Sequence, residues 1–248
     1  MITLKTPQQI VLMRQAGRIV AELLTELNKL VKPGLTTKEL DDFSERFILE
    51  RKALPAFKGY HGYPCTICTS INEEVVHGIP SSRKLREGDL LSIDAGAVYQ
   101  GFYGDAALTL PVGKATPEME KLMTVTKGAL QKGIEAARAG AFLSDISNAV
   151  QSHVERHGFS VVRDFVGHGI GQQLHEDPQI PNFGTPGQGA RLKVGMVLAI
   201  EPMINQGSWE VVVKDDHWTA VTKDGKLSAH FEHTIAVTEH EAEVLTKL

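Results

Sequence analysis

The feature that most constrains the fold of this chain is an internal repeat. Residues 85–94 (LREGDLLSID) and 192–201 (LKVGMVLAIE) share the order of their apolar positions, so that Asp94 and Glu201 occupy the same place in the two copies. A repeat of this kind indicates one ancestral unit that was duplicated. We therefore expect an approximate two-fold axis relating two strand layers, with acidic side chains from both halves meeting where the axis crosses the sheet.

The repeat extends beyond these two segments. The residues around Glu232 (HFEHTIAV) resemble those around Asp105, and a His-Gly-Ile triplet precedes each strand pair, beginning at His77 and at His168. Each half also has a Thr-Pro dipeptide at the start of a long amphipathic stretch, which is typical of a helix N-terminus. The pattern predicts helices over residues 6–30 and 36–51 in the first half, and over 116–139 and 144–157 in the second.

Residues 85–112 are the clearest local unit, because two runs of β-branched and apolar residues flank a short break at residues 99–101. This pattern predicts an antiparallel hairpin. A turn centred near Tyr99 and Gln100 would place Asp94 and Asp105 directly opposite each other and on the same face. Two facing carboxylates in apolar surroundings repel each other unless one is protonated or a cation lies between them. The hairpin therefore predicts a cation site.

The remaining segments are predicted from periodicity and turn residues. Strands are expected over residues 66–71, 159–165, 196–205, 211–213 and 231–237, with Trp218 on a further strand. Residues 54–64 carry aromatic side chains among glycines and predict a loop or irregular strand, and residues 172–191, rich in Gly, Pro and Gln, predict a surface loop. The glycines at 167–171 depart from the dinucleotide-binding pattern, which favours backbone that passes close to another ligand.

The composition fits one domain and excludes several classes of function. A chain of 248 residues with 42% hydrophobic content can bury one sizeable core, and no linker separates the two pseudo-repeats, about 1–112 and 113–248. The net charge of -4 gives no basic surplus for binding nucleic acid. No apolar run approaches the roughly 20 residues of a membrane span, and the first residues lack the features of a signal peptide. We expect one cytoplasmic α/β domain that binds neither nucleic acid nor membranes.

The only cysteines, Cys65 and Cys68, form a single Cys-x-x-Cys pair. A redox dithiol or half of a zinc site are possible functions, but there is no second pair and no thioredoxin-like context. We favour reduced thiols that line or support a pocket.

A metal centre is the best explanation for four acidic residues at matched positions, namely Asp94, Asp105, Glu201 and Glu232. A single strand acid is more often a solvated charge, but four matched acids in two repeats favour a shared role. With one histidine nitrogen, this set suits two divalent ions such as Mn, Fe, Co or Zn. Paired metals roughly 3.5 to 4 Å apart need bridging carboxylates, which facing hairpin residues would supply. Six histidines are left out of the site: His153, His157 and His240 lie on predicted helices or at the tail, and His217, His230 and His233 flank predicted strands without a matching partner.

These motifs together resemble a known family, the type I methionine aminopeptidases. The matching positions are Asp94, Asp105, His168 in GHGIG, Glu201 in EPM and Glu232 in EHT, and the resemblance covers essentially the whole chain. It implies the duplicated pita-bread fold, an α/β (α+β) arrangement in which helices flank a central antiparallel sheet with pseudo-two-fold symmetry. It also implies hydrolysis of the first peptide bond of a new polypeptide, which releases the N-terminal methionine when the second residue is small.

The resemblance implies a role for each ligand. Asp94 would bind one of two divalent metal ions, His168 and Glu201 the other, and Asp105 and Glu232 would bridge them. A water activated by the metals would attack the peptide carbonyl, and Glu201 would carry the proton of that water to the leaving amine.

Further matching positions would handle the substrate. His175 in LHEDP would stabilise the developing tetrahedral oxygen, and His77 in VVHGIP would orient the peptide beyond the cleaved bond. The matching methionine pocket comprises Tyr60, Tyr63, Cys68 and Trp218. Leu174 stands where many relatives have an aromatic residue, which would loosen the pocket wall.

Two other functions remain open. A proline-specific aminopeptidase or dipeptidase would share the fold and the ligands, although such chains usually carry an additional N-terminal domain. A metal-free module that binds the ribosome or RNA is disfavoured by the intact ligand set and the absence of a basic surplus. For the favoured function, the partners are the N-termini of nascent or newly released polypeptides, with transient ribosome contact, and we expect a monomer.

Overall fold

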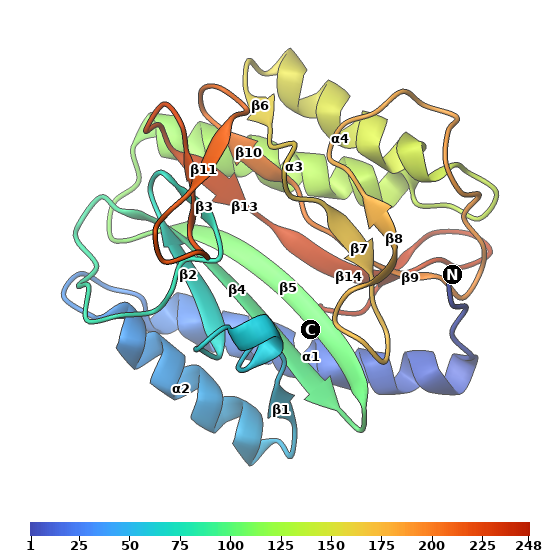
Figure 1. Cartoon of the computed structure of the whole chain (residues 1–248), viewed down its shortest axis with the longest axis horizontal. Coiled ribbons are helices and arrows are strands. Elements are labelled where there is room, and N and C mark those ends of the chain that lie inside the picture. The colour runs from blue at the N-terminus through green and yellow to red at the C-terminus, as the bar shows by residue number, and fades with distance from the viewer.

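The computed structural model describes all residues 1–248 and is built around one large antiparallel sheet. Its main path is β1-β4-β5-β14-β9-β7-β8 (Figure 1), and β2 also pairs with β4 and β15 with β14. The strands are β1 (Leu54–Pro55), β2 (Ile67–Ile71), β4 (Leu90–Tyr99), β5 (Phe102–Pro111), β7 (Gly167–Gly169), β8 (Glu176–Ile180), β9 (Val197–Ile200), β14 (Glu232–Ala236) and β15 (Glu243–Val244). The repeated strands thus share one sheet, and the expectation of two strand layers is wrong.

The two halves of the chain meet at the pairing of β5 with β14, where Glu232 pairs with Ala107 and His233 with Ala106. Outside this central pair, β4 flanks β5 and β9 flanks β14, so the two repeated strand pairs are arranged symmetrically about it. Backbone hydrogen bonds between these two strands join the halves, so the large sheet contains strands from both of them.

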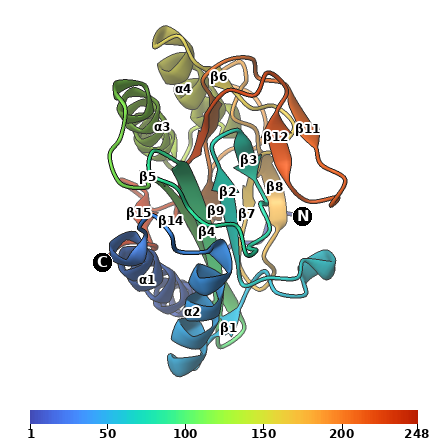
Figure 2. The ribbon, with the colours of Figure 1, turned by 90° about the vertical axis from the view of Figure 1, so that its left-hand side faces the viewer.

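Four helices complete the fold: α1 (Pro7–Leu30), α2 (Thr37–Glu50), α3 (Pro117–Ala136) and α4 (Leu143–Arg156). Helices α1 and α3 lie against the same face of the large sheet (Figure 2), while α2 packs beside α1 and α4 beside α3. Capping boxes at Thr6 and Thr36, and the Thr116 side chain at α3, start three of the helices as the sequence predicts. None of the helices has the length and apolar character needed to cross a membrane.

Helix α1 lies unusually close to β5, and this contact fixes the hairpin that carries the two aspartates. A Cβ atom at Gly104 would come within 2.6 Å of the backbone nitrogen of Gly17. Only glycine permits that approach, because any side chain would overlap the helix backbone. Around the contact, Val20, Leu23 and Leu27 are fully buried between the helix and the sheet.

The predicted hairpin is present, but its turn lies one residue away from the expected centre. Gln100 and Gly101 form a two-residue loop with φ of 48° and 81°, which is typical of a type I′ turn. As a result Asp94 pairs with Ala107, and Asp105 pairs with Gly96. The expectation that the two aspartates face each other directly is wrong. They remain on one face as diagonal neighbours, because alternate residues of a strand share a face.

Two small sheets and one short helix complete the structure. The sheets are β13-β10-β6 and β11-β12-β3, formed by β3 (Glu74–Val76), β6 (Ser160–Val161), β10 (Met203–Asn205), β11 (Val211–Val213), β12 (Ala220–Thr222) and β13 (Ser228–His230). The short 3₁₀ helix η1 covers Tyr60–Gly62 within the predicted aromatic loop.

Four predictions about strands and loops are wrong. The predicted strand 196–205 is interrupted at Glu201 and Pro202, where the chain leaves the large sheet and enters the sheet of β10. The predicted surface loop 172–191 contains β8, which pairs with β7 in spite of its polar sequence. The predicted strand 159–165 is reduced to Ser160–Val161, and Trp218 precedes β12 instead of lying in a strand. In each case pairing with a distant segment decides whether the residues form a strand, and the periodicity of the local sequence does not contain that information.

Candidate metal centre and peptide pocket

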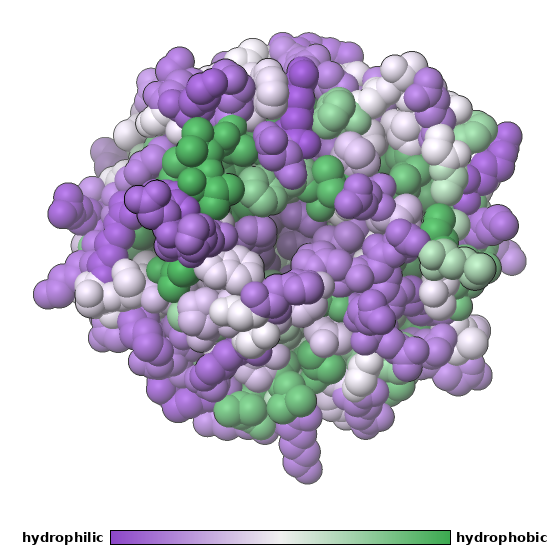
Figure 3. Space-filling model, in the orientation of Figure 1, coloured by the Kyte–Doolittle hydropathy of each residue, from purple (hydrophilic) through white to green (hydrophobic).

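The predicted site residues converge on one cavity of about 200 Å³. Its 14 lining residues are all the predicted metal ligands and pocket residues together with Phe57 and His61: Phe57, Tyr60, His61, Tyr63, Cys68, His77, Asp94, Asp105, His168, Leu174, His175, Glu201, Trp218 and Glu232. The face seen in Figure 3 is hollowed near its centre, and hydrophilic side chains surround much of the opening. Phe57 and His61 belong to the predicted aromatic loop 54–64, whose side chains suit a pocket wall, although the family resemblance assigned neither of them a role.

Sheet register explains how the carboxylates come together. Ala107 of β5 pairs with Asp94 of β4 on one side and with Glu232 of β14 on the other. Residues in such a row point to one face of the sheet, and Asp105 points to the same face because it lies two residues from Ala107. Glu201 follows the last residue of β9, and Ile200 pairs with His233 beside Glu232. Acids far apart in sequence therefore meet over the neighbouring strands β4, β5 and β14 and the end of β9.

The carboxylates are buried without enough partners of their own. Three of their oxygens have no hydrogen-bond partner: Oδ1 of Asp94, Oδ1 of Asp105 and Oε1 of Glu232. Burial raises the pKa of Asp94 to about 7, and burial together with neighbouring carboxylates raises the pKa of Asp105 and Glu232 above their usual range. Buried charges of one sign are costly unless a cation balances them. These orphaned oxygens fit a bound divalent metal.

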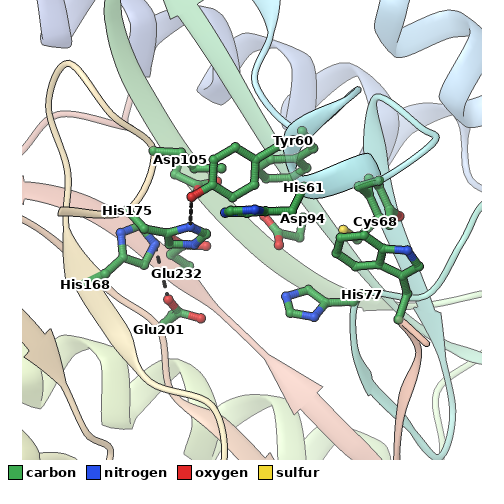
Figure 4. A pocket seen from close by; sticks show the side chains of 14 residues that line it. Tyr60, His61, Cys68, His77, Asp94, Asp105, His168, His175, Glu201 and Glu232 are labelled. Carbon is green, nitrogen blue, oxygen red and sulfur yellow. Dashed lines mark hydrogen bonds and ion pairs between the residues drawn. The ribbon is translucent and has the colours of Figure 1, made fainter. Parts of the chain in front are cut away.

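His168 is oriented as a metal ligand would be. Its Nδ1 donates a hydrogen bond to the carbonyl oxygen of Gly169 at 2.9 Å, which leaves the lone pair of the neutral ring on Nε2. That Nε2 lies 3.5 Å from Oε1 of Glu201 (Figure 4), and burial lowers the pKa of His168 to about 3. Asp105, His168 and Glu232 each offer a ligand atom within 4.8 Å of the other two. The donor set is one nitrogen among carboxylate oxygens, which suits borderline divalent ions.

His230 also lies at this cluster, although sequence analysis set it aside. Its Nε2 is 3.7 Å from Oε2 of Glu201 and 4.0 Å from Oε2 of Glu232, and neither ring nitrogen has a hydrogen-bond partner. Burial lowers the pKa of His230 to about 3, so the ring is neutral. Its position two residues before Glu232 is the feature of the sequence that could have placed His230 near the metal ligands. By contrast, His233 points to the other side and contacts Oγ1 of Thr246 at 2.9 Å.

Aromatic side chains form the wall of the cavity beside the carboxylates. Tyr63 donates its hydroxyl to the carbonyl oxygens of Ile67 and Gly78, at 3.1 and 3.0 Å, and its ring packs edge-on against Trp218 with centroids 5.0 Å apart. Cys68 on β2 pairs with Asp94, which places it between this wall and the carboxylates. Both cysteines are buried free thiols, and burial raises the pKa of Cys65 to about 11, which keeps it protonated.

Two further histidines, His77 and His175, line the cavity beside the carboxylates. His175 precedes β8, and its Nδ1 lies 2.8 Å from the hydroxyl oxygen of Tyr60. His77 follows β3 with a positive φ of 61°, and its ring packs edge-on against Phe165 and Trp218. Figure 4 shows His175 next to His168, with His77 on the Cys68 side of the cavity. A peptide placed between them would meet an imidazole on either side.

The chain is similar to known metallopeptidases over nearly its whole length. Residues 11–239 match metallopeptidase family M24. Methionine aminopeptidase 1 of Bacillus subtilis is 56% identical over 248 residues, covering 100% of both chains, and the methionine aminopeptidase of Clostridium perfringens is 53% identical, covering 99% of both. The crystal structure of methionine aminopeptidase from Thermotoga maritima superposes with a TM-score of 0.98 at 52% identity, covering 100% of each chain. The expected pita-bread fold is confirmed, and the chain belongs to metallopeptidase family M24 and, within it, to the methionine aminopeptidases.

Proposed function

We propose that this chain uses two divalent metal ions to remove the N-terminal methionine from newly made polypeptides whose second residue is small. The observation that carries the proposal is the row of Asp94 and Glu232 across Ala107, with Asp105, His168 and Glu201 around it, next to an aromatic pocket. Full-length similarity to methionine aminopeptidases supports the same substrate. Family membership makes this a metal-dependent hydrolase, whereas the use of two ions is part of our proposal.

The ligand assignment follows the family match and the positions of the side chains. By the family match, Asp94 would hold one ion, His168 and Glu201 would hold the other, and Asp105 and Glu232 would contribute to holding both. Mn, Fe, Co and Zn are all compatible with one imidazole among carboxylates. When bound, such ions polarise the scissile carbonyl and lower the pKa of a nearby water.

The residues of the chain would carry out the proton transfers and the orientation. Glu201 would accept a proton from the attacking water and deliver it to the amine that leaves as the carbon–nitrogen bond breaks. Its side chain lies between His168 and His230, at 3.5 and 3.7 Å, and these contacts restrict its orientation. His175 would donate a hydrogen bond to the carbonyl oxygen as negative charge develops there. His77 would orient the peptide on the far side of the bond.

The pocket wall suits a long, unbranched apolar side chain. Tyr63, Cys68 and Leu174 are buried, and Trp218 leans over Tyr63. A thioether packs favourably against aromatic rings, so methionine would gain both burial and sulfur–aromatic contact. Leu174 lacks the ring expected at its position, and we infer that the wall beside it tolerates a somewhat larger first side chain.

The pairing of β5 with β14 supports one folding unit that spans both pseudo-repeats. We propose that this unit acts as a monomer in the cytoplasm on chains that emerge from the ribosome. Sedimentation should then give the mass of one chain, 27.1 kDa, and denaturant unfolding should show one transition.

The decisive experiment compares peptide substrates after all metal has been removed. Metal-stripped protein, reloaded separately with Mn, Fe, Co or Zn, is assayed with Met-Ala-Ser and with an Xaa-Pro peptide. We expect free methionine from the first peptide, no cleavage of the second, and no activity without metal. Cleavage of the Xaa-Pro peptide alone would support a proline-specific peptidase, and turnover of neither peptide with any metal would support a binding module.

A further inference from the structure

Two neighbouring histidines in the cavity have different hydrogen-bond partners at the same ring atom. His168 and His175 lie with ring centroids 4.3 Å apart and planes at 72°. Nδ1 of His168 contacts a backbone carbonyl oxygen, whereas Nδ1 of His175 contacts the hydroxyl of Tyr60. The partner at one nitrogen of a neutral imidazole decides whether the other carries a proton or a lone pair. The two rings can therefore differ in chemistry although they are adjacent.

The tautomer of His168 is fixed by its partner, because a carbonyl oxygen can only accept. Nδ1 must carry the hydrogen in the 2.9 Å contact with Gly169, so Nε2 offers a lone pair toward Glu201. This is the form that binds a metal.

The partner of His175 has the opposite character. A phenol hydroxyl is a better donor than a neutral imidazole N–H, and an imidazole lone pair is a strong acceptor. The hydroxyl of Tyr60 makes no other hydrogen bond within the chain, so its proton is free to point at Nδ1 over the 2.8 Å contact. The hydrogen of His175 then belongs on Nε2.

The backbone around Tyr60 holds this hydroxyl in place. Helix η1 begins after Gly59, which has φ of 88°, and includes His61 at φ of 48°. The turn is closed by hydrogen bonds from the Gly59 amide to the Tyr63 carbonyl at 2.7 Å and from the Tyr63 amide to the Tyr60 carbonyl at 2.9 Å. The Tyr60 ring also packs edge-on against His61, with centroids 4.3 Å apart.

We propose that Tyr60 is a positioning residue which holds His175 in the Nε2–H tautomer, opposite to that of His168, so that one ring serves as a metal ligand and its neighbour as a hydrogen-bond donor. This inference rests on the proposed function, in which His175 donates to the carbonyl oxygen of the cleaved bond. Without the phenol, His175 would divide between two tautomers, and only one of them could donate from Nε2. Tyr60 thereby acts on the reaction through His175, in addition to lining the methionine pocket.

The direct test is the tautomeric state of the two rings in metal-free protein labelled with ¹⁵N-histidine. Long-range ¹H–¹⁵N correlation spectra distinguish the two neutral tautomers, and His168→Ala and His175→Ala variants assign the signals. We expect Nδ1–H for His168 and Nε2–H for His175 in the native chain. In Tyr60→Phe, the His175 signals should move toward values averaged over both tautomers, while those of His168 stay unchanged. Tyr99→Phe is the matched control, because Tyr99 packs on the core under α1 and α2, outside the cavity.

A kinetic test separates positioning from pocket lining. Tyr60→Phe in metal-loaded protein should lower kcat for Met-Ala-Ser by about tenfold or more with little change in KM, since the lost interaction acts in the transition state. In the His175→Ala background, the same substitution should have almost no further effect on kcat, because the residue it positions is absent.

Several outcomes would overturn the assignment. One is an Nδ1–H tautomer for His175 in the native chain, and another is an unchanged His175 spectrum in Tyr60→Phe. An effect of Tyr60→Phe confined to KM, or an undiminished effect in the His175→Ala background, would leave Tyr60 as a pocket wall only. The spectra do not depend on turnover, so a protein that cleaves no methionine peptide but shows the predicted tautomers would refute the proposed function and not the tautomer assignment.

Discussion

The Nε2 atom of His168 lies 3.5 Å from Oε1 of Glu201, so the ring and the carboxylate can serve one metal ion. The two residues reach this distance from different strands, since His168 pairs with Ala199 of β9 and Glu201 follows two residues later in the chain. Glu201 lies where the chain leaves the large sheet for β10. Glu201 therefore follows a strand that is paired on both sides, and its side chain lines the cavity.

Replacing the proposed proton carrier should abolish turnover more than substrate binding. Glu201→Gln is expected to lower kcat for Met-Ala-Ser by about 100-fold or more, because general acid–base groups contribute roughly 10²- to 10⁴-fold. Steady-state kinetics measures this, with metal content determined in the same samples. Glu135→Gln, on the exposed surface of α3, is the control. A Glu201→Gln variant that keeps a third of the native kcat would exclude Glu201 from proton transfer.

Asp105→Asn should stabilise the metal-free protein and weaken its response to metal. Burial and neighbouring carboxylates raise the pKa of Asp105, so in the folded metal-free chain this group must either take up a proton or repel Asp94, and the neutral Asn removes that cost. A gain of about 1 kcal/mol would raise the melting temperature by roughly 2 to 4 °C for a chain of this size. Calorimetry with chelator, and then with Mn, measures both effects. A variant that melts below the native chain in chelator, or that gains as much from Mn as the native chain does, would contradict the assigned role.

Metal-free protein should lose stability as the pH rises through neutrality, because the extra protons of the folded chain are released around the raised pKa of Asp94. Burial raises the pKa of Asp94 to about 7 and that of Glu232 above its usual range, so the folded chain holds more protons than the unfolded chain, and the unfolding free energy falls with rising pH. Below the ordinary histidine pKa of 6.5, the lowered pKa values of four buried histidines act in the opposite direction, namely His77, His168, His230 and His233, so the trend is measured above that pH. Denaturant unfolding between about pH 6.5 and about pH 8.5 measures the slope. Saturating metal should flatten it, and an equal slope with and without metal would show that these carboxyls do not bind metal.

Truncating the pocket wall should impair recognition of methionine. Trp218→Ala removes the ring that packs on Tyr63 at 5.0 Å, and losing contacts of an aromatic side chain costs about 1.5 to 3 kcal/mol. We expect KM for Met-Ala-Ser to rise by about 10- to 100-fold, with a smaller change in kcat. Trp209→Ala is the matched control, because Trp209 lies on the surface over Arg163. Equal effects of the two substitutions would argue against a methionine pocket at Trp218.

The close contact of α1 with the hairpin should not tolerate a methyl group. A Cβ at Gly104 would lie 2.6 Å from the nitrogen of Gly17, so Gly104→Ala must separate the helix from β5. Overpacking of this kind costs about 1 to 3 kcal/mol, which chemical denaturation can measure. We also expect weaker metal binding, because β5 carries Asp105. Native stability in Gly104→Ala would show that the helix shifts without cost.

Local sequence determined the helices, the hairpin and the acidic pairs. Thr6 and Thr36 each cap a helix with a residue three positions later, and such short-range chemistry acts in any tertiary setting. Alternation along the two hairpin strands determined which face Asp94 and Asp105 share, and the repeat linked Asp94 with Glu201 and Asp105 with Glu232. Family resemblance then identified His77, His168 and His175 among the ten histidines.

Only the tertiary structure decided which strands pair and in which register. The type I′ turn at Gln100 and Gly101 shifts Asp105 opposite Gly96, and the pairing of β5 with β14 places Glu232 beside Ala107. His230 joins the cluster, and Tyr60 meets His175, through contacts between segments more than 25 residues apart. Periodicity specifies the face on which a side chain lies, whereas its partners depend on hydrogen bonding and packing between distant segments, which no short stretch of sequence contains.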